Sequence, residues 1–285
     1  MSAPMKIAAA QIDIKLGDAS VNVKRMEDIL RETSWQQAEI TIFPEAALCG
    51  YCFESLDEAM QYAEPIDGPS IQRLHEICQE LNRHCIFGML ETDEQRLFNT
   101  CVLLGPQGLV GQYRKVHLPT LGVDQFTTPG DEFELFSVND VRVGLNICYD
   151  SAFPEAARIL ALAGADLIAL PTNWPPGAFC NADHVINARA MENGIYYAAV
   201  NRVGEERGFH FIGKSRICDP DGGNLAVADH DQEAILYATI DPSTARTKRK
   251  VRVPGKHEID RFADRRPEVY AAYAEVSATA SNRPT

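Results

Sequence analysis

The sequence predicts a mixed α/β fold in which buried strands alternate with amphipathic helices. Short apolar stretches rich in β-branched residues recur between segments whose apolar residues have helical spacing. No linker rich in glycine, serine or proline divides the chain into halves. This pattern continues over most of the 285 residues, which indicates one large domain over residues 1–270 and a polar C-terminal tail at 271–285.

The first half of the chain is expected to hold two helices among several short strands. One helix of about 15 residues begins near Ala19, and Pro69 occupies the first turn of a second helix that reaches Leu81. Apolar and β-branched residues predict strands at 5–12, 39–43, 85–90, 98–104 and 109–113. A Gly-Pro-Gln-Gly turn at 105–108 connects the last two strands.

The second half repeats the alternation of strand and helix. Helices are predicted at 153–160, where proline and glutamate begin the first turn, and at 182–193, where Gly194 can end the helix. Strands are predicted at 141–147, 166–170, 195–200, 208–217 and 234–240, with a turn at 219–222.

Composition excludes several classes of partner. The net charge of −13 argues against nucleic acid and against anionic membrane surfaces. No apolar run approaches the roughly 20 residues that cross a bilayer, and the N-terminus enters a strand without a signal peptide. Eight cysteines are too sparse for a disulfide scaffold, so a reduced, cytoplasmic protein is expected.

Cys148 lies where the strand at 141–147 gives way to a helix. Free backbone N–H groups and the positive end of the helix dipole at such a turn would favour the thiolate, the nucleophilic form of cysteine. The alternative for an isolated cysteine is a small buried hydrophobic residue.

Two further polar residues follow strands. Glu45 comes directly after the strand at 39–43, where partial burial would raise its pKa towards that of a general base. Lys115 follows the strand at 109–113, and its ammonium could stabilise negative charge on a reacting carbonyl oxygen. Taken singly, the alternatives are a solvated loop glutamate and an ordinary basic strand edge formed by Arg114 and Lys115.

Together these three sites resemble the nitrilase (carbon–nitrogen hydrolase) superfamily, with its Glu-Lys-Cys triad. The resemblance covers nearly the whole chain and is carried by ordered motifs. These are Phe43-Pro44-Glu45 with Gly50-Tyr51, Tyr113-Arg114-Lys115 with His117-Leu118-Pro119, Gly144 through Cys148-Tyr149-Asp150 with Phe153-Pro154-Glu155, Pro171-Thr172-Asn173-Trp174, Arg189-Ala190 with Glu192-Asn193, and Gly213-Lys214-Ser215 with Pro220-Asp221-Gly222.

The resemblance implies a four-layer α-β-β-α sandwich, no metal or organic cofactor, and a homodimer or larger homo-oligomer. It implies that Cys148 is the nucleophile, Glu45 the general base and acid, and Lys115 the cation that stabilises the oxyanion. The backbone N–H of Tyr149 would be the second oxyanion donor. The implied reaction is hydrolysis of a non-peptide C–N bond through a thioester on the cysteine.

Asp124 marks a departure from the family pattern. Many members place a second glutamate between the lysine and a Pro-Gly-Asp turn, and Asp124 best fills that place here. Aspartate is one methylene shorter, so the backbone must come closer or a water must intervene. The alternative is that Asp124 only caps a turn in the loop.

The residues after the Cys-x-Asp motif indicate the substrate class. Some relatives carry arginines there that bind a substrate carboxylate, whereas this chain has Ser151 and Ala152. A neutral or amine-bearing small molecule is therefore expected, such as an aliphatic amide or an N-carbamoyl amine, although an arginine from another loop could substitute. The expected pocket residues are Tyr51, Phe53, Glu54, Phe126, Tyr149, Asn173, Trp174 and Phe179.

Several of these assignments have alternatives. The aromatic residues could be plain core packing, which is least expected for Trp174 because Asn-Trp-Pro-Pro is typical of a loop. Glu54 could bind a substrate ammonium or be solvated. His117 is expected to be a structural hydrogen-bonding residue.

Three other functions remain open from the sequence. The chain could be a true nitrilase that attacks a nitrile through a thioimidate, or a non-catalytic binding protein that keeps the fold. A thiol redox role for the spaced pair Cys49 and Cys52 is a weaker alternative.

Overall fold

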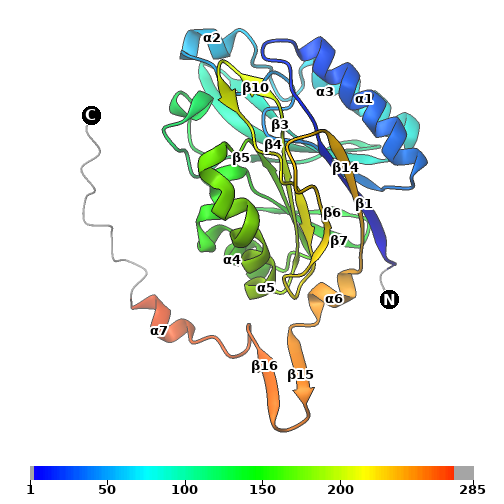
Figure 1. The fold of residues 1–285 in the computed structure, drawn as a ribbon, viewed down its shortest axis with the longest axis vertical. Helices are drawn as coiled ribbons and strands as arrows, with labels where there is room; N and C mark the ends of the chain where they lie inside the picture. The colour runs from blue at the N-terminus through cyan, green and yellow to red at the C-terminus, as the bar shows by residue number, and fades with distance from the viewer. Residues whose placement is uncertain (1–2, 273–285) are drawn as a thin grey trace. The chain divides into compact units, whose positions relative to one another are not determined.

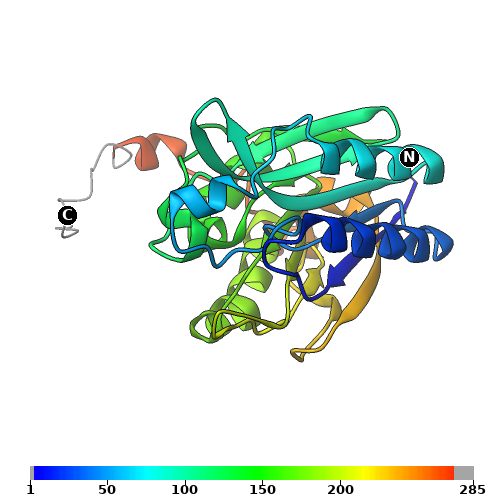
Figure 2. The same cartoon turned by 90° about the horizontal axis from the view of Figure 1, so that it is seen from above.

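Two six-stranded β-sheets stack face to face, and helices cover their outer faces. The computed structural model describes residues 3–272. Strands β1 and β3 of the first sheet contact β9 and β8 of the second. Helices α1 and α3 lie on one side of the strands and α4 and α5 on the other (Figures 1 and 2). The predicted α-β-β-α sandwich is confirmed.

The first sheet has the strand order β14-β1-β2-β3-β4-β5. Strand β2 runs parallel to β1 and β3, and the other neighbours are antiparallel. Helices α1 (Ala19–Trp35) and α3 (Pro69–Leu81) pack their apolar faces on it. The strands are β1 (Met5–Gln11), β2 (Ile40–Ile42), β3 (His84–Asp93), β4 (Arg96–Gly105), β5 (Gly108–Arg114) and β14 (Ala234–Ile240).

The second sheet has the order β13-β12-β9-β8-β7-β6, with β7, β8 and β9 parallel. Helix α4 (Pro154–Ala163) lies so close to β7 that a Cβ at Gly144 would meet Leu160 at 2.9 Å. Helix α5 (Ile186–Asn193) packs beside α4 and ends at Gly194 as predicted. The strands are β6 (Leu135–Val138), β7 (Val141–Leu145), β8 (Leu167–Thr172), β9 (Tyr196–Asn201), β12 (Arg216–Cys218) and β13 (Asn224–Val227).

The remaining elements are short. They are α2 (Leu56–Met60), the 3₁₀ turns at Gly122–Gln125, Cys148–Ala152 and Pro176–Ala178, the π-helical turn at Asn181–Val185, β10 (Glu205–Glu206), β11 (Phe209–His210) and α6 (Pro242–Arg246).

The described chain forms two compact units rather than one. The first ends at Arg246, and the second begins at Thr247 and contains β15 (Arg249–Val253), β16 (His257–Asp260) and α7 (Pro267–Ala271). Residues 247–270, which the sequence analysis placed in the single domain, therefore belong to the second unit. Of the predicted tail at 271–285, all but the first two residues lie outside the described residues.

The predicted helices and strands differ from the observed ones where pairing between distant segments decides which residues form an element. The predicted strand at 208–217 is divided into β11 and β12, because Gly213 and Lys214 both adopt positive φ between them. The predicted helix at 182–193 begins with a π-helical turn before it becomes α5. The edge strands β6 and β13, with four residues each, were not predicted because short edge strands depend on their neighbour for definition.

Two further observations concern membrane-spanning helices and the cysteines. Among residues 3–272, no helix is both long and apolar enough to cross a membrane. All eight cysteines carry free thiols, and Cys78, Cys85, Cys101 and Cys218 are buried.

Gly88 of β3 tests how closely this sheet approaches the turn that carries Glu45. A Cβ at position 88 would lie 2.3 Å from the Ala46 nitrogen and 2.6 Å from the Glu45 Cα. We expect Gly88→Ala to lower the free energy of unfolding by about 3 kcal/mol, because the backbone on both sides is packed. Urea denaturation measures this. Gly177→Ala is the matched control, since a Cβ there meets nothing within 4 Å, and an equal loss in both variants would contradict the prediction.

Candidate active site

Glu45, Lys115 and Cys148 each follow a strand end, and they come from both sheets. Glu45 follows β2 and Lys115 follows β5, both in the first sheet, whereas Cys148 follows β7 in the second. All three side chains are buried. The candidate site is therefore buried where the strand ends of the two sheets meet.

The Lys115 ammonium is held between two carboxylates. It donates to Glu45 Oε1 at 2.7 Å and to Asp124 Oδ2 at 2.5 Å, and no side chain of the three is exposed. Asn99 of β4 joins the same carboxylates by donating to Glu45 Oε1 at 2.7 Å and to Asp124 Oδ1 at 2.8 Å. The charged groups are therefore fixed by direct bonds in a region of low dielectric.

Asp124 reaches this cluster because its backbone comes close. The 3₁₀ turn at Gly122–Gln125 carries it, and the Tyr51 hydroxyl also donates to Asp124 Oδ2 at 2.7 Å. Gly122 adopts φ +49°, and a Cβ there would lie 2.3 Å from the Tyr51 ring. The shorter side chain thus bonds Lys115 directly, and the alternative that Asp124 only caps a turn is wrong.

Cys148 begins a 3₁₀ turn in an unusual backbone conformation. Its φ of +42° is rare for a residue with a side chain. The first N–H used inside the turn belongs to Asp150, which donates to the Ile147 carbonyl at 2.9 Å. The N–H groups of Cys148 and Tyr149 precede it and have no carbonyl partner within the turn, as an oxyanion donor requires.

Burial and neighbouring charges together set the pKa of these groups. Burial raises the pKa of the Glu45 carboxyl, although the charge of Lys115 opposes the rise. Burial disfavours the Lys115 ammonium, yet its pKa is raised well above the ordinary value because Asp124 and Glu45 surround it. The pKa of the Cys148 thiol is raised to about 12 by burial and by the Glu45 carboxylate, against the opposing effect of Lys115.

The turn was expected to favour the thiolate, but the pKa of the Cys148 thiol is raised and not lowered. A short 3₁₀ turn supplies too weak a dipole to offset full burial beside a carboxylate. With its pKa raised to about 12, the Cys148 thiol is protonated near pH 7. It needs a base at the moment of attack, and Glu45, whose pKa is raised as predicted, is the neighbouring candidate.

Comparison with known proteins agrees with this geometry. The family model described as "Carbon-nitrogen hydrolase" matches residues 6–250. The chain belongs to the carbon–nitrogen hydrolase family. A nitrilase of Pyrococcus abyssi is 36% identical over 93% of this chain and 99% of its own length, and the human omega-amidase NIT2 is 33% identical over 93% and 96%.

Solved structures share the fold of this carbon–nitrogen hydrolase. An amidase from Nesterenkonia sp. AN1 superposes with a TM-score of 0.79 at 23% identity, covering 94% of this chain and 96% of that one. Nit3 of Saccharomyces cerevisiae, a member of the nitrilase superfamily, superposes with a TM-score of 0.80 at 23% identity, covering 90% and 97%.

Among the expected substrate-binding residues, Asn173 and Trp174 are buried, and Asn173 lies beside Cys148. The Asn173 backbone N–H lies against the Cys148 sulfur. Its side-chain amide, the Trp174 Nε1 and Glu45 Oε2 are buried without a hydrogen-bond partner among the described residues. Buried polar atoms are rarely left unpaired, so these atoms are available to a polar substrate.

The other expected pocket residues differ in exposure. Tyr51 and Phe53 are buried, and Phe126 and Tyr149 are partly buried. Glu54 is 80% exposed, with its carboxylate 3.7 Å from Arg207, and with Tyr51 and Phe53 it lines a cavity of about 160 Å³. Phe179 is 46% exposed, and Lys214 lies over its ring, so the structure does not support it as a pocket wall.

Sequence reasoning missed Asn99 and Asp150. Asn99 interrupts an apolar strand, and a buried polar residue in such a strand was the available signal. Asp150 was quoted only as part of the cysteine motif, although its buried carboxylate accepts four hydrogen bonds. Two of these come from His117, which is confirmed as a structural hydrogen-bonding residue.

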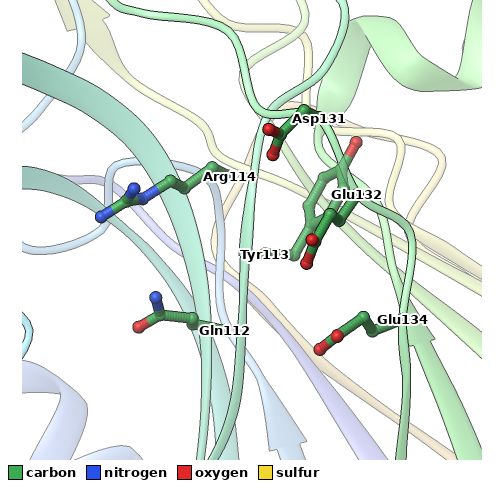
Figure 3. A pocket seen from close by; sticks show the side chains of 6 residues that line it. All are labelled: Gln112, Tyr113, Arg114, Asp131, Glu132 and Glu134. Carbon is green, nitrogen blue, oxygen red and sulfur yellow. The ribbon is translucent and has the colours of Figure 1, made fainter.

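Arg114 and Lys115 do not form one basic edge. Lys115 enters the buried site, whereas Arg114 pairs with Glu91 and Asp93 and covers the Phe98 ring at 3.8 Å. Figure 3 shows Arg114 pointing away from the acidic side chains that line a separate cavity of about 250 Å³. That cavity is lined by Gln112, Tyr113, Arg114, Asp131, Glu132 and Glu134.

Within residues 3–272, no three His, Cys, Asp or Glu side chains are grouped to hold a metal ion.

Cys49 and Cys52 give little support to a redox role. Neither thiol is in a disulfide. Burial raises the pKa of each to about 12, which keeps both protonated and weakly nucleophilic near neutral pH.

The pKa of Cys148 gives a test of its surroundings. Glu45→Gln removes a negative charge that raises this pKa and leaves the opposing Lys115, so the pKa should fall below about 12. Alkylation of Cys148 by iodoacetamide, followed by peptide mass spectrometry from pH 7 to 10, should be faster in the variant at each pH. Slower alkylation throughout would show that Glu45 does not raise the thiol pKa.

Asp124 is tested by removing its charge while keeping its size. Asp124→Asn should lower kcat by about ten- to a hundredfold, because Lys115 loses one of the two bonds that fix its ammonium. It should also lower the Lys115 pKa, which Asp124 raises. Steady-state kinetics measures the first effect, and Asp131→Asn, an exposed residue in the following loop, serves as control. Equal kcat in the two variants would exclude a role for Asp124.

Proposed function

We propose that this carbon–nitrogen hydrolase is an amidase that cleaves small, non-peptide amides or N-carbamoyl amines through a thioester on Cys148. The observation that carries the proposal is a buried thiol of raised pKa enclosed with a carboxylate of raised pKa and a buried ammonium. A site of this kind can move a proton from sulfur to carboxylate and stabilise the resulting oxyanion without change in its total charge.

The reaction runs in two halves. Glu45 accepts the Cys148 proton as sulfur bonds to the amide carbon, and Lys115 with the Tyr149 N–H stabilises the oxyanion. The C–N bond then breaks, Glu45 returns the proton to the departing amine or ammonia, and a thioester remains. Glu45 next takes a proton from water, whose oxygen attacks the thioester, and the carboxylic acid leaves as the thiol is restored.

Relatives support amide rather than nitrile as substrate. The Pseudomonas sp. relative that is 34% identical over 80% of this chain is an (R)-stereoselective amidase, and the human relative is an omega-amidase. The Nesterenkonia amidase was solved with the acetamide moiety of fluoroacetamide added to its active-site cysteine. One relative, from Pyrococcus abyssi, is named a nitrilase, but the amidase relatives and structures do not favour a nitrile as substrate.

The charge around the cysteine favours a neutral or amine-bearing substrate. Ser151 is buried and donates to the Cys148 carbonyl at 2.7 Å. Arg189 contacts the Ser151 carbonyl at 3.1 Å and pairs with Glu192. Arg207 pairs with Glu58, so neither arginine is set to bind a substrate carboxylate.

We further propose a homo-oligomer in the cytoplasm, which the second unit and the free thiols support. Strands β15 and β16 form a two-stranded hairpin, which is marginally stable alone, and Val251 and Val253 are exposed on it. Basic residues outnumber acidic ones in this unit, whereas the whole chain carries −13. Attraction to an acidic second copy fits both features.

A matched substrate pair tests the activity. Propionamide should release ammonia at least tenfold faster than propionitrile in wild type, and Cys148→Ala should abolish release because no thioester can form. Ammonia release measures turnover, and mass spectrometry of quenched wild type should find the acyl group on Cys148. Faster release from the nitrile would favour the nitrilase alternative, and turnover by Cys148→Ala would exclude Cys148 as nucleophile.

A further inference from the structure

The Asp150 carboxylate joins the segment that carries Lys115 to the segment that carries Cys148. It is completely buried. Oδ2 accepts from the Ile147 N–H at 2.9 Å and from the Tyr113 hydroxyl at 2.8 Å. Oδ1 accepts from the His117 N–H at 3.2 Å and from His117 Nδ1 at 2.8 Å. These four bonds hold a carboxylate that no lysine or arginine of residues 3–272 pairs with.

The positions of these partners in the sequence make the arrangement informative. Tyr113 and His117 lie two residues to either side of Lys115, and Ile147 directly precedes Cys148. One carboxylate thus binds both flanks of the cation and the residue next to the nucleophile. The two segments come from different sheets, so their spacing is not set by strand pairing.

The backbone around Cys148 needs such support. The Ile147 N–H donates to the Asp150 side chain while the Asp150 N–H donates to the Ile147 carbonyl at 2.9 Å. This reciprocal pair encloses Cys148, whose φ of +42° is strained. On the outer side, the His117 ring stacks on Phe153 at 3.7 Å, where the turn passes into α4.

We infer that Asp150 is a positioning residue, with Tyr113 and His117 as its partners, and that it sets the distance between the Cys148 sulfur and the Lys115 ammonium. It touches neither substrate nor a reacting atom, and it acts by placing two groups that do. The kinetic test of this inference rests on the proposed function. A second test does not, because it measures the reactivity of the Cys148 thiol. A displacement of about 1 Å between reacting groups can cost a hundredfold in rate.

Three variants weaken the hydrogen bonds around the Asp150 carboxylate in steps. Tyr113→Phe keeps the ring but removes the hydroxyl, which donates to Asp150 and accepts from the Val116 N–H. His117→Phe removes the ring bond while keeping a ring to stack on Phe153. Asp150→Asn keeps the size but presents an amide N–H₂ to surrounding donors. We expect kcat to fall about five- to tenfold in the first two variants and about a hundredfold in the third, with KM within about threefold throughout.

Asp166→Asn is the matched control for burial. Asp166 is as buried as Asp150, accepts from the Arg142 N–H at 2.9 Å and pairs with Arg246. It directly precedes β8, outside the segments that carry the triad. Asp166→Asn should lower the melting temperature. It should leave kcat unchanged when kcat is calculated per mole of reactive Cys148. The double variant Tyr113→Phe/Asp150→Asn should lose no more than Asp150→Asn alone, because both act through one carboxylate.

Alkylation of Cys148 by iodoacetamide gives a readout that needs no amide turnover. It should slow at least fivefold in Asp150→Asn, because the thiol moves away from the Lys115 ammonium, which opposes the rise in the thiol pKa, and it should stay unchanged in Asp166→Asn. If the wild-type protein has no amidase activity, the proposed function is wrong, but the comparison of alkylation rates still tests the role of Asp150. Unchanged kcat and alkylation in Asp150→Asn, or equal losses in Asp166→Asn, would overturn the inference. If Asp150→Asn fails to fold, Tyr113→Phe and His117→Phe decide by the same two measurements.

Discussion

The fully buried contact of Lys115 with Glu45 and Asp124 is the constraint on which the rest of the site depends. Each bond is short, and no side chain of the three is exposed. Buried ions remain charged only when partners replace their lost hydration, and removing one partner of such a pair costs about 3–5 kcal/mol. Two carboxylates around one ammonium leave one negative charge, which Asn99 and Tyr51 stabilise by donating hydrogen bonds.

This excess negative charge explains how the thiol behaves. A thiolate formed at rest would add a second negative charge to a buried site, so the thiol keeps its proton and its pKa is raised. When Glu45 takes that proton, the total charge of the site does not change. The same step leaves Lys115 with one charged carboxylate partner, and its ammonium then becomes more available to an oxyanion.

Much of this arrangement could be predicted from the sequence, and the failures have physical causes. Glu45, Lys115 and Cys148 each follow an apolar strand, so their convergence was predictable from motif order and from the family resemblance. The raised pKa of the Cys148 thiol could not be predicted, because it depends on burial and on a carboxylate distant in sequence. Asn99 and Asp150 were missed since their roles appear only when segments distant in sequence bring their partners together. The edge strands β6 and β13 and the hairpin of β15 and β16 likewise depend on pairing rather than on local pattern.

The departure at Asp124 shows how backbone and side chain compensate each other. A carboxylate one methylene shorter than glutamate still lies 2.5 Å from the Lys115 ammonium. The turn that carries it can approach because Gly122 has no Cβ to meet the Tyr51 ring. Tyr51 then donates its hydroxyl to the same carboxylate, so one close contact both permits the short side chain and fixes it. Asp124→Glu alone would therefore crowd Tyr51 and Lys115, and the identity of residue 124 cannot be separated from the glycine two positions before it.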